Sequence, residues 1–114
     1  MTVTPVCIIQ SVVVTGSDVS VYTSPASTAT IVDKFTATNT DSSNHTLNVN
    51  IIPSGGSVGA GNLVISVITV NANSTLDITQ LQNQILNTGD AISVKASAAS
   101  DIIVRGSGRQ VTLP

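Results

Sequence analysis

The sequence of 114 residues is poor in charge and in aromatic side chains. Charged residues make up 9% of it, against about 25% in a typical soluble domain, and every acidic residue is an aspartate. There is no tryptophan, and tyrosine, phenylalanine, histidine, cysteine and methionine occur once each. With four basic residues and a formal net charge of −2, the chain lacks the basic patch that nucleic-acid binding requires. A disulfide within the chain is excluded, because Cys7 is the single cysteine.

Long apolar runs and a targeting segment are also missing. No stretch approaches the length of about 20 apolar residues that spans a bilayer. Residues 1–10 lack the basic region that begins a signal peptide. We therefore expect a protein that is made in a cytoplasm and has no membrane partner.

The residues that are abundant favour β-structure. More than a third of the chain is valine, isoleucine or threonine, and serine and asparagine supply much of the remainder. Strong helix formers such as glutamate, lysine, arginine, methionine and leucine are scarce. The composition therefore predicts an all-β protein rather than a helical bundle.

Short apolar or alternating segments recur along the whole chain and are separated by turn residues, as in a β-sandwich. The pattern predicts one antiparallel β-sandwich domain over residues 1–114, immunoglobulin-like or jelly-roll, with at most one short helical turn near residues 79–87. Residues 1–16 form either a strand or an arm. The eight predicted strands are residues 5–15, 19–23, 30–38, 45–52, 62–70, 75–78, 90–98 and 102–111.

Three predictions concern which side chains are buried. Alternation along residues 30–38 places Ile31 and Phe35 on the same, core-facing side. Residues 62–70 are apolar without alternation, which predicts burial on both faces, the second by a neighbouring subunit. Cys7 lies in an apolar run and is expected to be a small core side chain.

Candidate chemistry is sparse. The glycine-rich segment 54–61 lacks the lysine of a phosphate-binding loop and precedes a predicted strand, so a flexible hairpin connection is the better interpretation. His45 has no partner at the spacing of a metal-ligand motif, and the aspartates lie mostly beside turns. We therefore expect no enzyme activity, no cofactor and no metal site.

A chain with so little charge has weak protection against association through its strand edges and faces. Surface of this kind is usually covered by neighbours in an assembly. The composition therefore favours a homo-oligomer, a dimer or trimer, over a monomer that is kept soluble by serine, threonine and asparagine.

Several segments between Tyr22 and Arg109 give the sequence a resemblance to a known group of proteins. It resembles small structural proteins of tailed bacteriophages, and residues 1–16 lie outside the resemblance. The segments that carry it are Tyr22-Thr23-Ser24-Pro25-Ala26, Ile31-Val32-Asp33-Lys34, Thr36-Ala37-Thr38-Asn39, Ile51-Ile52-Pro53-Ser54-Gly55-Gly56, Ile85-Leu86-Asn87-Thr88-Gly89-Asp90-Ala91-Ile92, Ala96-Ser97-Ala98 and Ser107-Gly108-Arg109.

The resemblance implies a non-enzymatic virion protein that is made in the bacterial host cytoplasm and decorates or cements the capsid. A neck, tail or fibre protein is the alternative, and a glycan- or receptor-binding module is a more remote one. The implied partners are further copies of the chain and the major capsid protein. The residues predicted to make subunit or capsid contacts are Lys34, Leu63, Ile65, Ile68, Lys95, Arg105 and Arg109.

Overall fold

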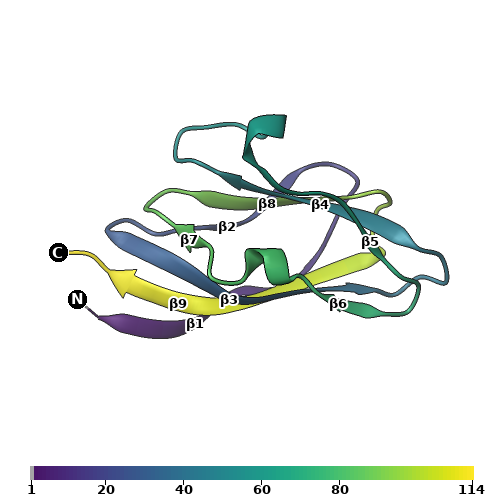
Figure 1. Ribbon diagram of the computed structural model, residues 1–114, viewed down its shortest axis with the longest axis horizontal. Helices are drawn as coiled ribbons and strands as arrows, with labels where there is room; N and C mark the ends of the chain where they lie inside the picture. Colours follow the sequence, from purple (N-terminus) through teal and green to yellow (C-terminus); the bar gives the residue numbers. More distant parts are fainter. Residues whose placement is uncertain (1) are drawn as a thin grey trace.

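The predicted strands are present in the computed structural model, which describes residues 2–114 (Figure 1). No helix among these residues is long and apolar enough to cross a membrane. The strands are β1 (Val3–Val13), β2 (Val19–Thr23), β3 (Thr28–Asn39), β4 (His45–Ile52), β5 (Leu63–Val70), β6 (Thr75–Asp77), β7 (Ile85–Leu86), β8 (Ala91–Ala96) and β9 (Ile102–Thr112), and the two 3₁₀ turns are η1 (Ala60–Asn62) and η2 (Thr79–Leu81).

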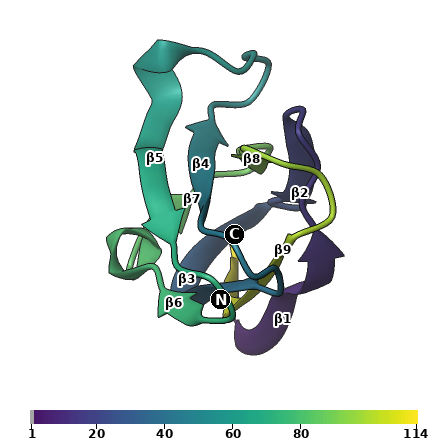
Figure 2. The ribbon, with the colours of Figure 1, turned by 90° about the vertical axis from the view of Figure 1, so that its right-hand side faces the viewer.

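The strands form two antiparallel sheets that pack face to face (Figure 2). Sheet A has the order β1-β9-β3-β6, with β7 also paired to β3, and sheet B has the order β2-β8-β4-β5. The pairs are nested around the β4–β5 hairpin: β3 pairs with β6 and β7, β2 with β8, and β1 with β9. A long antiparallel ribbon folded over in this way is a jelly roll. Of the two predicted kinds of sandwich, immunoglobulin-like and jelly-roll, the topology is that of the jelly roll.

The core lies between the two sheets and is built almost entirely from aliphatic side chains. Phe35 is the one aromatic side chain in it, and it is completely buried. Burial of this apolar surface is the main stabilising contribution to the fold. Other fully buried core residues are Val32, Leu47, Val49, Leu86, Ile92, Val94, Ile102 and Val104.

A bulge in β3 changes which side chains face the core. The register against β9 shifts between Val32 and Lys34, which leaves Asp33 as an extra residue. Val32 and Phe35 are three positions apart, yet both are fully buried, whereas Ile31 is only half-buried. The prediction that Ile31 shares the core face with Phe35 is wrong, because strict alternation does not account for an inserted residue.

The N-terminal segment is a strand of the chain's own sheet A, where β1 forms one edge beside β9. Register shifts after Val6 and after Ile9 interrupt its pairing. Ile8 and Ile9 are consecutive and both buried, while Cys7 is exposed. The expected burial of Cys7 in the core is therefore wrong, because Val6 and Ile8 on either side of it face the core and the Cys7 side chain points outward.

β5 is an edge strand of sheet B and is not buried on both faces as predicted. Its register against β4 shifts between Ile65 and Ile68, so that both side chains turn inward. Val67 lies in the bulge with a φ of 61° and is 61% exposed. The backbone N–H of Val67 donates a hydrogen bond of 2.9 Å to Asn48 Oδ1. The continuous apolar run thus reflects a bulge rather than a covered second face.

The two irregular segments follow the sequence predictions in outline. The predicted helical region contains only η2, whose Leu81 is buried, before the chain continues as β7. The glycine-rich segment connects the antiparallel strands β4 and β5, as expected of a hairpin. It folds back toward β4, because the buried Asn50 donates hydrogen bonds to Gly59 O and to Asn62 Oδ1.

Candidate assembly surface

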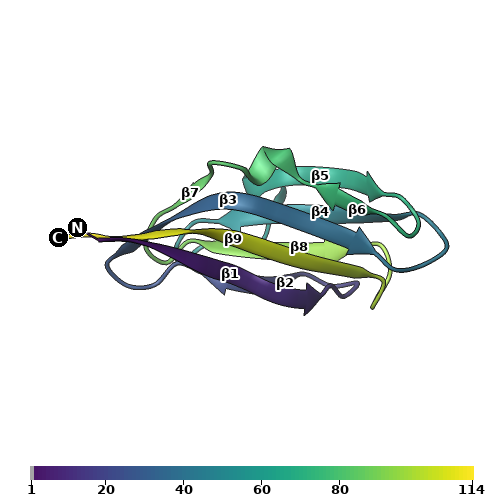
Figure 3. The same ribbon diagram turned by 90° about the horizontal axis from the view of Figure 1, so that it is seen from below.

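The outer face of sheet A gathers three of the four basic residues. On β9, Val104, Gly106 and Gly108 are buried, whereas Arg105 and Arg109 lie on the opposite face. Lys34 joins them from β3, because its register partner is Ser107 of β9. Figure 3 shows β1, β9 and β3 side by side in this sheet. The tertiary structure therefore brings Lys34 next to Arg105 and Arg109, which lie far along the chain from it.

Two ion pairs order the charges on this face. Arg109 donates hydrogen bonds to Asp33 from Nη2 at 2.8 Å and from Nε at 3.1 Å. The hydrogen bonds to Asp33, and then its negative charge, raise the pKa of the Arg109 guanidinium. Lys34 Nζ lies 3.6 Å from Asp77 Oδ2, in a pair that is largely solvated. Exposed ion pairs contribute little to folding because solvent screens them, so these side chains remain available for contacts with another molecule.

An open groove of about 680 Å³ lies on the same face. It forms where small residues of β9, Gly106 to Gly108, are flanked by bulged stretches of β1 and β3. The exposed Cys7 lies in its lining, and the Sγ atom is 3.5 Å from Ile9 O. Other lining residues are Pro5, Val6, Asp33, Lys34, Thr36 and Arg105.

The pairing register places apolar side chains in two rows beside the groove. The strands that carry them meet at the end of the sheet where both termini lie (Figure 3). The pairing register places Val3 and Ala29 on either side of Val111 in one row. In the next row, Pro5, Arg109, Ile31 and Ile85 follow one another across β1, β9, β3 and β7. Val3 is 56% exposed and Ile85 59% exposed. An apolar patch of this kind is typical of a surface that a partner covers.

The seven residues predicted to make contacts do not share one surface. Lys34, Arg105 and Arg109 lie on sheet A, whereas Lys95 lies on sheet B, opposite Asn48. Leu63 and Ile68 are half-buried on the edge strand β5. Ile65 is 6% exposed and faces the core, so we leave it out of the candidate surface.

The apolar rows on sheet A were not predictable from the sequence. Ile31 was assigned to the core because the bulge at Asp33 has no sequence signal. Val3 and Val111 come from opposite ends of the chain, and only the β1–β9 pairing makes them neighbours. The one local signal was the alternation along residues 102–111, which places Arg105, Arg109 and Val111 on one face.

The positions of the described residues do not support two alternative functions, hydrolysis and sugar binding. The segment Gly55–Gly59 matches the G-x-S-x-G pattern of hydrolases, but it joins two antiparallel strands instead of a strand and a helix. His45, the only histidine, lies at the opposite end of β4. The two aromatic residues offer no stacking platform for a sugar: Phe35 is buried, and the half-buried Tyr22 hydroxyl is 2.7 Å from Thr30 Oγ1.

Comparison with solved structures finds chains of similar fold in a pilus and in a virus. A chain of the Bacillus endospore appendages, which form a family of disulfide-linked pili, has a TM-score of 0.56 at 17% identity, covering 99% of this chain and 88% of that one. A chain of infectious bursal disease virus, Gx strain, has a TM-score of 0.50 at 12% identity, covering 96% of this chain and 31% of that one. The T13 particle of the same virus gives a TM-score of 0.52 at 11% identity, covering 96% and 30%.

These similarities establish a shared fold. No known family profile matches the sequence. No curated protein matches it either.

Proposed function

We propose that this protein is a non-enzymatic structural subunit that associates with other copies of itself through the outer face of sheet A. The observation that carries the proposal is the pair of apolar rows around Val3, Ile31, Ile85 and Val111. These rows lie beside the cluster of Lys34, Arg105 and Arg109. Burial of the rows supplies the free energy of association, and the charges set the register between neighbouring subunits.

The proposal is supported by the kind of protein that has this fold. The match to the pilus chain spans almost the whole of both chains, as expected for a subunit of similar size. The match to the viral chains spans less than a third of their length, so there the jelly roll is one part of a larger protein. The pilus chain, which is matched over most of its length, is therefore the better precedent of the two.

Two kinds of assembly are compatible with this surface. In a filament, Cys7 would cross-link copies in pairs, because it is exposed on the same face as the apolar rows and a chain with one cysteine forms one disulfide. On the capsid of a tailed phage, which the sequence resemblance implies, Lys34, Arg105 and Arg109 would face acidic groups of the major capsid protein. Lys95 cannot contact the same partner surface, since it lies on sheet B.

Self-association is tested with a matched pair of aspartate substitutions. We expect Val3→Asp, at 56% exposure on sheet A, to weaken self-association at least tenfold, because it places a charge in the apolar row. Val67→Asp, at 61% exposure on sheet B, is the control and should leave association unchanged. Sedimentation velocity at increasing concentration measures both. A wild-type chain that stays monomeric at high micromolar concentration, or equal effects of the two substitutions, contradicts the proposal.

Electron microscopy of the purified full chain separates the two assemblies. A filament-forming subunit is expected to grow into fibres under oxidising conditions, and Cys7→Ser should make the fibres shorter or easier to dissociate. A decoration protein is expected to remain a small oligomer under all conditions. If the length and stability of the fibres do not change in Cys7→Ser, the disulfide link is contradicted, whereas the proposed contact through sheet A is not.

A further inference from the structure

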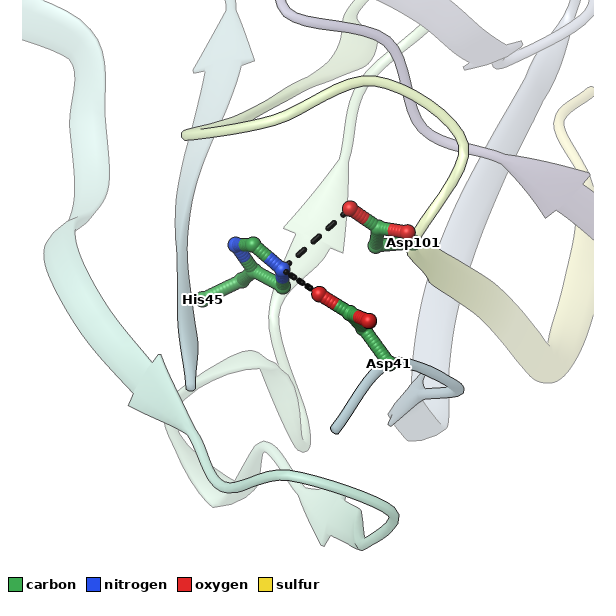
Figure 4. A group of neighbouring side chains, drawn as sticks. All are labelled: Asp41, His45 and Asp101. Atoms are coloured by element: carbon green, nitrogen blue, oxygen red, sulfur yellow. Dashed lines mark hydrogen bonds and ion pairs between the residues drawn. The ribbon is translucent and has the colours of Figure 1, made fainter. Parts of the chain in front are cut away.

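Three side chains from separate segments converge at the end of the sandwich opposite the termini. Asp41 lies in the β3–β4 turn, His45 is the first residue of β4, and Asp101 immediately precedes β9. His45 Nε2 is 2.8 Å from Asp41 Oδ2 and 3.2 Å from Asp101 Oδ2 (Figure 4). The residues around His45 in the sequence form no metal-ligand motif. Asp41 lies in a turn, and Asp101 becomes a neighbour of His45 only through the tertiary fold.

The backbone around these side chains is held by well-formed hydrogen bonds. Asn39 is completely buried, and its Oδ1 accepts a hydrogen bond of 3.0 Å from the Asp41 N–H. Its Nδ2 donates to Ser43 O at 2.8 Å and to Val70 O at 3.0 Å. The Thr40 N–H donates to Asp101 O at 2.9 Å. The β3–β4 turn and the β8–β9 loop are therefore tied together before any ligand binds.

The two carboxylates in this cluster favour a positive charge beside Nε2, which either a proton on the imidazole or a bound metal ion can supply. Two carboxylate oxygens face the same nitrogen, and a single N–H at that position can serve only one of them well. In the neutral tautomer that carries its proton on Nδ1, the Nε2 lone pair points at both anions.

The other ring nitrogen of His45 has a partner suited to a metal ligand. Nδ1 is 3.5 Å from Ser97 Oγ, and this hydroxyl also accepts a hydrogen bond of 3.0 Å from the Thr46 N–H. Histidines that bind metals commonly direct their second nitrogen to such an acceptor, which turns the free lone pair toward the ion. The side chains of His45, Asp41 and Asp101 are 15%, 38% and 29% exposed, so an ion can enter from solvent.

We propose that Asp41, His45 and Asp101 bind one Zn²⁺ ion. One imidazole nitrogen and two carboxylate oxygens form a ligand set that zinc accepts, whereas Ca²⁺ requires six to eight oxygens and Mg²⁺ prefers oxygen ligands. Zinc bonds of about 2.0–2.2 Å place ligand atoms roughly 3.3–3.5 Å apart. The three atoms already lie within 4.8 Å of one another. The separations of Nε2 from the two carboxylate oxygens need to open by at most about 0.7 Å.

The site would join the two sheets of the jelly roll. His45 begins a strand of sheet B, Asp101 precedes a strand of sheet A, and Asp41 lies on the turn that connects the sheets. An ion held by all three is bound by the folded state and not by the unfolded chain, so it stabilises the fold by mass action. This inference does not depend on the proposed self-association, because the cluster lies within one chain.

Calorimetric titration of ZnCl₂ into the metal-stripped full chain tests the site. We expect one Zn²⁺ per chain with micromolar affinity and at least tenfold weaker binding of Ca²⁺ or Mg²⁺. Zinc at a hundredfold excess over Kd should raise the unfolding midpoint by about 5 °C or more. The proposal is overturned if the titration gives no heat up to millimolar zinc, or if Ca²⁺ binds as tightly as Zn²⁺.

Matched variants assign the binding to these side chains. His45→Gln and Asp101→Asn should each reduce zinc affinity at least tenfold. Asp18→Asn, an exposed aspartate in the adjacent β1–β2 loop, and Cys7→Ser should leave it unchanged. Circular dichroism without metal checks that each variant is folded. If His45→Gln does not fold, Asp101→Asn alone tests the assignment. Loss of binding in Cys7→Ser, or full binding in both His45→Gln and Asp101→Asn, assigns the ion elsewhere and overturns the proposal.

Discussion

Gly108→Ala is expected to destabilise the protein by about 3 kcal/mol or more, which is at the severe end for a single substitution. Gly108 lies on β9 opposite Val32 of β3, in the centre of sheet A. A Cβ atom at this position would overlap the carbonyl oxygen of Ile31 and lie 3.2 Å from its carbonyl carbon. These are backbone atoms, so relief requires β3 and β9 to move apart.

The control for this substitution is Gly61→Ala in η1. A Cβ atom at Gly61 meets no heavy atom within 4 Å, so the free energy of unfolding should change by less than about 0.5 kcal/mol. Urea denaturation of both variants, followed by circular dichroism, gives the two values. Equal stability of Gly108→Ala and Gly61→Ala would mean that β3 and β9 are not packed as closely as the register indicates.

Phe35→Ala is expected to lower the free energy of unfolding by about 3–5 kcal/mol, the usual loss for a large buried aromatic. Phe35 is completely buried and is the largest side chain in the core. The core around it is aliphatic, and strands on both sides restrict its collapse into the cavity. A chain of this size has a total stability of about 5–15 kcal/mol, so a substantial unfolded population at 37 °C is a realistic outcome.

Phe35→Leu separates the loss of volume from the loss of the apolar contact. Leucine retains most of the apolar surface, so we expect a cost below about 2 kcal/mol. Chemical denaturation measures both variants, with the slope on denaturant concentration as a check that the unfolded state is unchanged. A loss below about 1 kcal/mol for Phe35→Ala would contradict the placement of Phe35 in the centre of the core.

The jelly-roll strands were largely predictable, but the faces of several strands were not. A strand needs only local information, namely β-branched residues, alternation and turn residues at its ends. A bulge inserts one residue and reverses the inward and outward faces beyond it. This is why alternation predicts Ile31 in the core in place of Val32. The burial of Cys7 was expected for a different reason, its position in an apolar run, whereas its neighbours Val6 and Ile8 are the residues that pack on the core.

The candidate surface and the cation cluster were predictable to different degrees. Lys34, Arg105 and Arg109 were named from the sequence because charges are rare in this chain, and the structure places these three on one face. Asp101 and His45 are 56 positions apart and share no motif; they meet because β4 pairs with β8, and the loop after β8 carries Asp101 to the start of β9. Pairing between distant strands depends on the whole fold and leaves no local trace in the sequence.

The sequence by itself determined that this protein is an all-β sandwich with a weakly charged surface, since composition and alternation are properties of each segment alone. The tertiary structure decided the jelly-roll topology, the apolar rows on sheet A and the meeting of Asp41, His45 and Asp101. Each of these depends on which strands pair and where a bulge shifts their register. Those choices minimise the free energy of the whole core, so they are not encoded in any single segment.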